Sequence, residues 1–183
     1  MNVLGSVLQN VATGKHIGVS SRGDTICTLH KDDDRSCITL YNYKEKQFSK
    51  IKSFPSPLSY WYQSFTVALG SNVIYITNIK KQYIYTLSMD GTLLGTYGRE
   101  GGRGAGMLQY PRAAATDGDD NLLVCDWSNR RLQVMTRDGK WHIVDTDKEI
   151  GWLWDAVVDG DHVYALCSLP GTGQVIYHFK ITE

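Results

Sequence analysis

The chain has 183 residues, of which 42% are hydrophobic and 11% aromatic, as expected of a globular, strand-rich protein with a core of its own. Its 19 basic and 19 acidic residues cancel, which excludes the overall basic charge that is the simplest sign of nucleic-acid binding. No run approaches the ~18 consecutive apolar residues of a membrane span, and the first residues lack the charged start and long apolar core of a secretory signal.

Cysteine usage points to a reducing compartment. The sequence has four cysteines and five histidines, with no Cys-x-x-Cys pair and no histidine spacing typical of a metal site. It also has no Asn-x-Ser/Thr sequon. This pattern favours reduced, mostly buried thiols over a disulfide framework. We therefore expect a cytoplasmic protein with no cofactor and no bound metal.

Short alternating apolar segments, separated by Gly, Asp and Asn turns, predict β-strands along the chain. The predicted strands form four groups, at 16–20, 25–30, 37–42 and 47–52; at 64–69, 73–78, 82–87 and 92–97; at 112–116, 121–125, 131–136 and 140–144; and at 154–158, 162–167 and 174–180. No stretch shows a helical period. The only long linker is the glycine-rich segment 98–106.

The groups of strands repeat one another. Residues 67–91 superpose on residues 115–139 without a gap, and weaker copies begin near residues 19 and 158. A strand-rich repeat of about 40–50 residues is typical of a β-propeller. We predict an all-β fold, a single propeller domain over 1–183 with about four four-stranded blades, at 12–58, 59–110, 111–150 and 151–183.

The last predicted blade lacks its fourth, outermost strand. Residues 3–8 could supply this strand, because propellers commonly close by pairing strands from the two ends of the chain. A chain cut from a larger propeller would show the same pattern, and we expect this second explanation to hold.

The third repeat resembles the NHL repeat. The resemblance rests on Pro-Arg-x-x-Ala-x-Asp at 111–117, Asp-x-x-Asn-x-Arg-Leu-Gln-Val at 126–134, and Asp-Gly at 138–139. The preceding segment 97–110 resembles the linker between NHL blades. The match is specific over 95–139, recognisable over 65–91, and limited to the strand pattern elsewhere.

This resemblance implies the C-terminal propeller of tripartite-motif (TRIM) NHL proteins, which usually has six blades, so that two blades are absent from this chain. The other repeats are degenerate: Asn78 stands at the position of Asp126, and Tyr83 at that of Arg131. The ring, the zinc-binding B-box and the coiled coil of that family are also absent from the sequence. The resemblance therefore implies a substrate- or RNA-recognising module of the ubiquitin-ligase family, without its catalytic part.

Blade topology predicts which loops share a face. In a four-stranded antiparallel blade, the linker between blades and the loop between the second and third strands lie on the same face. The residues that we expect to bind a partner on this face are Arg103, Tyr110, Arg112, Trp127, Asn129, Arg130, Lys80 and Lys81. Further residues placed there are Tyr60, Trp61, Tyr62, Asn78, Gln82, Ser128, Trp152 and Trp154.

Each of these residues also has a structural interpretation. Trp127 would pack beside the next blade, and Asn129 would bond within its own turn. We expect Arg131 to pair with Asp126 as a structural bridge. The acidic run within residues 31–35 of the first blade would repel phosphate, so any RNA should lie over the second and third blades.

Three functions follow from these patterns. The first is a non-catalytic binding module that recognises a protein partner or a ubiquitination substrate, with no membrane or DNA partner. The second is binding of single-stranded RNA through the face that carries Arg112, Arg130 and Lys81. The third is a metalloenzyme similar to peptide-amidating lyases, disfavoured because His16 is the only histidine in the predicted innermost strands.

Overall fold

The computed structural model describes residues 16–19, 24–32, 35–44, 47–56, 65–100, 102–144 and 150–180. Within these ranges the regular elements are all β-strands, so no helix there is long and apolar enough to cross a membrane. The strands form three four-stranded sheets, one three-stranded sheet and one two-stranded pair. The all-β prediction is therefore confirmed.

The four larger sheets each contain consecutive antiparallel strands. The first sheet consists of β1 (His16–Val19), β2 (Thr25–Asp32), β3 (Arg35–Lys44) and β4 (Gln47–Pro55). The second consists of β5 (Phe65–Leu69), β6 (Val73–Asn78), β7 (Tyr83–Ser88) and β8 (Leu93–Tyr97). The third consists of β11 (Pro111–Thr116), β12 (Leu122–Asp126), β13 (Arg131–Met135) and β14 (Trp141–Ile143). The fourth consists of β15 (Trp152–Asp159), β16 (His162–Leu169) and β17 (Gly173–Lys180).

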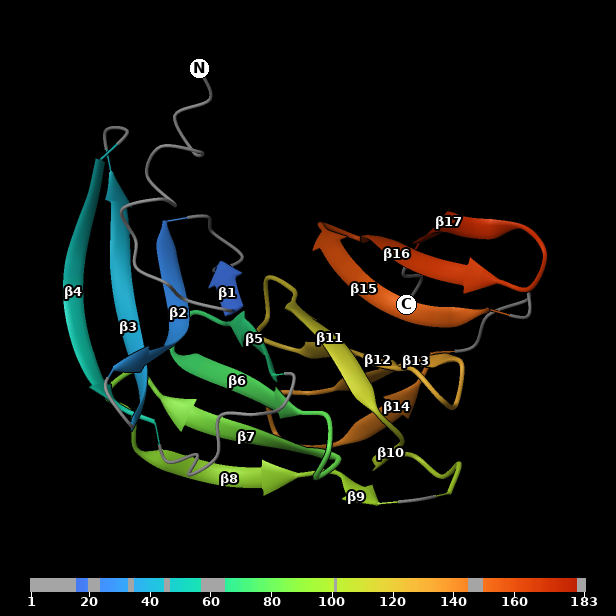
Figure 1. Ribbon diagram of the computed structural model, residues 1–183, viewed down its shortest axis with the longest axis horizontal. Coiled ribbons are helices and arrows are strands. Elements are labelled where there is room, and N and C mark those ends of the chain that lie inside the picture. The colour runs from blue at the N-terminus through green and yellow to red at the C-terminus, as the bar shows by residue number, and fades with distance from the viewer. Residues whose placement is uncertain are drawn as a thin grey trace.

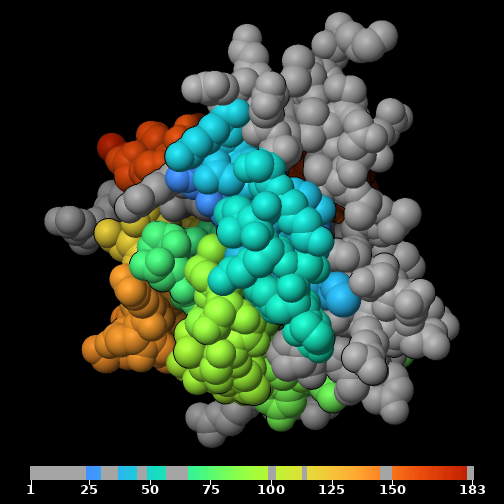
Figure 2. All heavy atoms as spheres, turned by 90° about the vertical axis from the view of Figure 1, so that its left-hand side faces the viewer, coloured from blue at the N-terminus to red at the C-terminus, as the bar shows by residue number. Residues whose placement is uncertain are grey.

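The sheets are arranged as successive blades around a common centre (Figure 1). Their first strands lie innermost and contact one another in chain order, β1 with β5, β5 with β11, and β11 with β15. The later strands lie toward the rim, and β4 and β8 cover much of the side shown in Figure 2. This arrangement is that of a β-propeller, as the repeat predicted.

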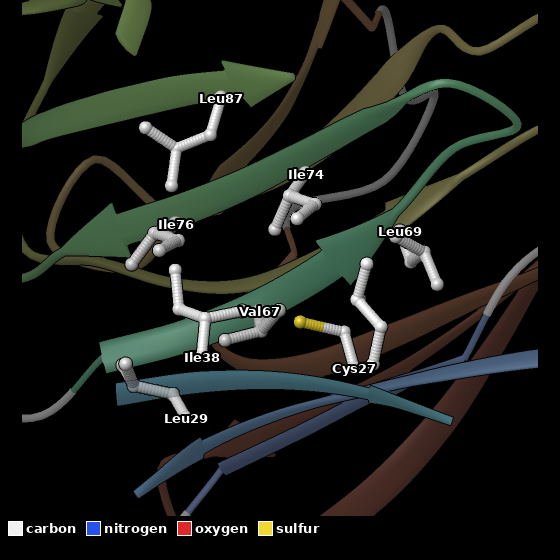
Figure 3. Close-up of a cluster of buried hydrophobic side chains, with 9 residues drawn as sticks. Cys27, Leu29, Ile38, Val67, Leu69, Ile74, Ile76 and Leu87 are labelled. Atoms are coloured by element: carbon white, nitrogen blue, oxygen red, sulfur yellow. The ribbon is translucent and has the colours of Figure 1, made fainter. Parts of the chain in front are cut away.

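The hydrophobic core lies between neighbouring sheets. The first and second sheets enclose a cluster that includes Cys27, Ile38 and Ile76 (Figure 3). Corresponding clusters join the second sheet to the third, and the third to the fourth. Because β6 lies between two such clusters, all six of its residues are buried. Each blade is therefore stabilised mainly by the blades beside it.

The glycine-rich linker differs from the prediction. It contains a short strand, β9 (Arg99–Glu100), which pairs in parallel with β10 (Met107–Leu108) directly after the linker. Gly102 and Gly106 have φ values of 89° and 75°, in the left-handed region that glycine enters without steric cost. The segment can therefore fold back on itself. The fourth sheet has three strands, as predicted, whereas residues 3–8 lie outside the described residues.

Candidate functional site

Strand register places the predicted loops on one face of the propeller. Pro111, at the start of β11, pairs with Asp126 at the end of β12, and Asp126 pairs with Arg131 at the start of β13. In the fourth sheet, Trp152 at the start of β15 pairs with Ser168 near the end of β16. We call the face that contains these strand ends the linker face.

A fully buried carboxylate organises the third blade at this face. Asp126 is 0% exposed, and its Oδ1 accepts a hydrogen bond from the backbone N–H of Gln109 at 2.6 Å. Its Oδ2 accepts bonds from Asn129 Nδ2 at 2.8 Å, Arg131 Nε at 2.9 Å and Gln133 Nε2 at 2.9 Å. A buried charge is tolerated only when it is paired and hydrogen-bonded in this way. The expected pairing of Arg131 with Asp126 is confirmed.

The same side chains hold the glycine-rich linker. Arg131 Nη2 donates to the carbonyl oxygens of Gly104 at 3.0 Å and Met107 at 2.8 Å, and Arg131 Nη1 donates to the carbonyl oxygen of Arg103. Gln133 Nε2 adds a bond of 2.9 Å to Met107 O. These bonds join the linker to the blade that follows it. We call Asp126, Asn129, Arg131 and Gln133 the linker clamp.

Two predicted binding residues belong to this region. The side-chain amide of Asn129 donates to Asp126 and also to Gly102 O at 3.1 Å. Its structural interpretation, a bond within its own turn, is therefore confirmed. Arg103 is exposed and contributes its backbone carbonyl to the clamp. Ser128, in the same turn, donates its backbone N–H to Gln109 O at 3.0 Å.

Beside the clamp, arginine and tryptophan side chains stack across two sheets. The guanidinium carbon of Arg112 lies 5.0 Å from the ring centroid of Trp127 and 4.5 Å from that of Trp154. The guanidinium carbon of Arg130 lies 4.4 Å from the ring centroid of Trp152. These distances are within the range of favourable cation–π contacts.

Trp127 is the centre of this group. Its ring centroid lies 6.3 Å from that of Trp152, 6.0 Å from that of Trp154 and 6.3 Å from that of Tyr110. Trp127 thus packs against the next blade, and its structural interpretation is confirmed. We call Tyr110, Arg112, Trp127, Arg130, Trp152 and Trp154 the arginine–tryptophan cluster.

Local backbone irregularities position the cluster. The register of β11 against β12 shifts around Arg112, and that of β15 against β16 shifts around Trp154. Such bulges commonly redirect a side chain at the edge of a sheet. Tyr110 and Arg130 have φ values of 53° each, in a region that residues with a Cβ rarely enter. Strained backbone of this kind is concentrated at functional sites.

The cluster presents aromatic surface and hydrogen-bond donors. Tyr110 is 45% exposed and Trp154 is 37% exposed. The indole nitrogen of Trp154 donates to Ser168 Oγ at 2.6 Å. By contrast, Trp127 Nε1 and Arg112 Nε are buried and have no hydrogen-bond partner among the described residues. Buried donors left without an acceptor cost about 1–3 kcal/mol each.

The structure does not join the predicted lysines to this cluster. Lys80 and Lys81 are exposed in the turn between β6 and β7, where the backbone N–H of Lys81 donates to Asn78 Oδ1 at 3.0 Å. In the part of the chain that the structure describes, neither lysine side chain forms a hydrogen bond, ion pair or ring contact with the cluster. Tyr60, Trp61 and Tyr62 lie outside the described residues.

The described residues bring together no group of three or more His, Cys, Asp or Glu side chains that could hold a metal ion. The side chain of His16, the one histidine expected near the centre of the propeller, is outside this description. The donors at the linker face are instead backbone N–H groups, guanidinium groups and indole nitrogens.

Sequence reasoning placed Trp152 and Trp154 on this face but did not include them among the binding residues. One signal in the sequence could have identified them. They stand at the start of the innermost strand of the last blade, at the positions that Tyr110 and Arg112 occupy in the third blade. The contacts between these two pairs depend on how the blades pack. The strand pattern alone does not report them.

The comparisons with known proteins show the fold. No protein-family model matches the chain, and no curated protein matches it. Solved structures match over most of the chain, among them virginiamycin B lyase from Staphylococcus aureus in its inactive H270A form with quinupristin, at 13% identity and a TM-score of 0.56, covering 92% of this chain and 56% of the lyase. The WD40 repeats of RRP9 match at 13% identity and a TM-score of 0.58, covering 90% and 50%.

A nidogen/laminin complex gives a third match, at 16% identity and a TM-score of 0.57, covering 90% of this chain and 58% of the other. The chain thus spans about half the length of these proteins. At such identities the likeness establishes the β-propeller fold of this chain. The structural neighbours are repeat proteins of the propeller kind, and one of them, nidogen, is in complex with laminin.

Proposed function

We propose that this chain is a non-catalytic binding module of the NHL type, related to the propellers of tripartite-motif NHL proteins, and that it recognises a protein partner or ubiquitination substrate. The arginine–tryptophan cluster carries this proposal. Support for the NHL relationship comes from the linker clamp, because Asp126, Asn129 and Arg131 are residues on which the resemblance rests. The free thiols of Cys27 and Cys167 support a reducing, cytoplasmic setting.

The composition of the cluster fits the centre of a protein interface. Tryptophan, tyrosine and arginine are the residues most enriched at the energetic centres of such interfaces. Here they are held in place before any partner arrives, by stacking between the third and fourth sheets. A preorganised surface loses less side-chain entropy on binding than a mobile one. Trp154 and Tyr110 supply its exposed aromatic area.

Peptide display tests the proposal without a known partner. A random peptide library is selected on the immobilised protein, and the enriched peptides are then measured against Trp154→Ala and Arg112→Gln. We expect both variants to weaken binding by roughly tenfold or more. Leu94→Ser, on the outer strand β8 at 59% exposure, is the matched control and should bind like the parent chain.

Two results would contradict the proposal: no peptide is enriched, or the enriched peptides bind the cluster variants and the parent equally. Circular dichroism and thermal unfolding of each variant establish that a loss of binding is not a loss of fold.

Binding of single-stranded RNA is the second candidate, favoured by the cations Arg112, Arg130 and Lys81 on loops of one face. A gel shift over a series of salt concentrations tests it. Affinity that arises from phosphate contacts falls steeply as salt rises. The absence of a shift even at low salt would exclude this candidate.

A further inference from the structure

We propose that the chemical group recognised by the arginine–tryptophan cluster is a carboxylate, carried by an acidic peptide segment beside an apolar side chain. This inference rests on the proposed binding function and specifies the partner's chemistry. It follows from the donors at the site, from the carboxylates already present, and from the surfaces that the stacking leaves open.

Only hydrogen-bond donors are left unsatisfied at the centre of the cluster. Arg112 forms no ion pair with any described acidic residue, and its Nε is buried without a partner there. The indole N–H of Trp127 is likewise buried and has no hydrogen-bond acceptor among the described residues. Because a guanidinium group has no acceptor atom, a ligand that hydrogen-bonds to the half-buried Arg112 side chain must bring oxygen acceptors.

Stacking leaves the guanidinium of Arg112 suited to a planar anion. Two indole rings lie against it, at 5.0 Å and 4.5 Å. A planar guanidinium that stacks on aromatic rings keeps its N–H groups in the plane, where they match the two oxygens of a carboxylate. The rings also restrict the rotation of the side chain. Less conformational entropy is then lost when a carboxylate binds.

The two carboxylates that the structure describes near the cluster, Asp126 and Asp155, are already engaged. Asp126 is fully buried and bonded to the linker clamp. Asp155 follows Trp154 in β15, and its Oδ1 accepts the backbone N–H of Ala156 at 2.9 Å. Neither makes an ion pair with Arg112 among the described residues. Within the described part of the chain, no carboxylate neutralises the positive charge of Arg112.

Two observations favour a peptide carboxylate over a chain of phosphates. One indole face each of Trp127, Trp152 and Trp154 already holds a guanidinium, which reduces the aromatic area open to stacked bases. The chain as a whole has no net positive charge to attract a polyanion. The exposed rings of Tyr110 and Trp154 instead offer contact to an apolar side chain next to the acidic one.

Nuclear magnetic resonance of the indole N–H groups tests this directly. The probes are acetyl-Phe-Glu-Phe-Glu-amide and its neutral twin acetyl-Phe-Gln-Phe-Gln-amide, each titrated to millimolar concentration into the ¹⁵N-labelled full chain. We expect the acidic peptide to shift the Trp127 and Trp154 resonances, with an affinity roughly tenfold above that of its twin. The resonance of Trp141, which packs between the second and third sheets, should stay in place.

Variants of Arg112 locate the charge effect. In Arg112→Gln, we expect the two peptides to bind equally, because the cation that distinguishes them is gone. Arg112→Lys keeps the charge but loses the planar pair of donors, so the preference for the acidic peptide should fall several-fold. Leu94→Ser should behave like the parent chain.

Several results would overturn the carboxylate proposal. These are an equal response to the two peptides in the parent chain, no shift with either peptide, or stronger shifts of the same resonances with inorganic phosphate or single-stranded oligouridylate. Failure here is distinct from failure of the proposed function. Displayed peptides that depend on Trp154 but carry no carboxylate would retain the binding role and reject only the acidic partner.

Discussion

At the scale of single residues, Asp126 is the position on which the linker face depends most. Its carboxylate accepts four hydrogen bonds. One comes from the backbone N–H of Gln109, and the others come from the side chains of Asn129, Arg131 and Gln133. Arg131, its ion-pair partner, has a side chain only 13% exposed. Removing either partner would leave the charge of the other buried without its counter-charge.

We expect Asp126→Ala to lower the free energy of unfolding by about 3–5 kcal/mol, because it removes one partner of a buried ion pair. Asn129→Ala should cost less, about 1–3 kcal/mol, since it removes one hydrogen bond to the Asp126 carboxylate and one to Gly102 O but leaves no charge without its counter-charge. Urea unfolding followed by circular dichroism measures both.

Asp119→Asn is the control for these variants, because Asp119 lies in an exposed turn and should change stability by less than about 0.5 kcal/mol. An Asp126→Ala variant as stable as this control would show that the clamp is not important for stability.

At the scale of elements, the turns that join the third and fourth strands of the second and third blades share one chemistry. Ser88 donates to the Asp90 carboxylate, and Thr136 donates to that of Asp138. Gly91 and Gly139 follow with φ values of 91° and 85°. The repeat seen in the sequence is thus reproduced down to the hydrogen bonds of its turns.

Acid should weaken these turns. The hydrogen bond from Lys140 is the main cause that lowers the pKa of Asp138 to about 2, from an ordinary value of 3.8. The side-chain bond from Ser88 is the main cause that lowers the pKa of Asp90 to about 2. A carboxyl whose pKa is lower in the folded state contributes stability above its unfolded pKa, and this contribution is lost as the pH falls toward the folded value.

We therefore expect the stability of the parent chain to fall between about pH 4 and pH 2 more steeply than that of Asp138→Asn. Urea midpoints measured at several pH values in this window give the comparison. Parallel curves for the two proteins would show that Asp138 does not titrate differently in the folded and unfolded states.

Glycine substitutions separate the cost of backbone conformation from that of contact between blades. A Cβ at Gly139 would lie 2.9 Å from a ring carbon of Tyr97 in the second sheet, whereas one at Gly160 would meet nothing within 4 Å. Both positions have positive φ. We expect Gly160→Ala to cost about 1 kcal/mol through φ alone, and Gly139→Ala to cost about 1 kcal/mol more.

Thermal unfolding of the two variants beside the parent chain tests this difference. An equal loss of stability in the two variants would mean that the Tyr97 ring moves away from the new Cβ without a cost in free energy.

At the scale of the whole molecule, stability comes from the interfaces between blades. Two of these interfaces each contain a buried cysteine, whose reactivity shows when that interface opens. Cys27 lies in the cluster between the first and second sheets, and Cys167 in that between the third and fourth. Burial raises the pKa of Cys27 to about 12 and that of Cys167 to about 11. Cys37 is only partly buried.

We expect a thiol reagent at pH 8 to leave Cys27 and Cys167 unlabelled in the native protein, since the thiolate is the reactive form and these two buried thiols remain protonated. With rising urea, Cys167 should become reactive before Cys27. The reason is that the fourth sheet, as described, has three strands where the first has four, and terminal repeats with fewer contacts open first.

Mass spectrometry of the labelled peptides gives the order. Simultaneous labelling of Cys167 and Cys27 would mean that the blades unfold as one cooperative unit.

The sequence by itself determined the strands, the repeat of blades, and the pairing of Asp126 with Arg131. These features depend on residues close together in the chain: side chains alternate along a strand, and Asp126 and Arg131 stand opposite each other across one short turn. The same local rules predicted that the loops of the linker face would lie together.

Only the tertiary structure decided which of those loop residues form a site. Arg112 meets Trp154 because two blades pack side by side and a bulge redirects each residue. Lys80 and Lys81, assigned to the same face by the same rule, make no described contact with the cluster. The parallel pairing of β9 with β10 likewise depends on how the linker folds back. Packing between sheets and local shifts of register are set by many distant side chains at once, so no single stretch of sequence encodes them.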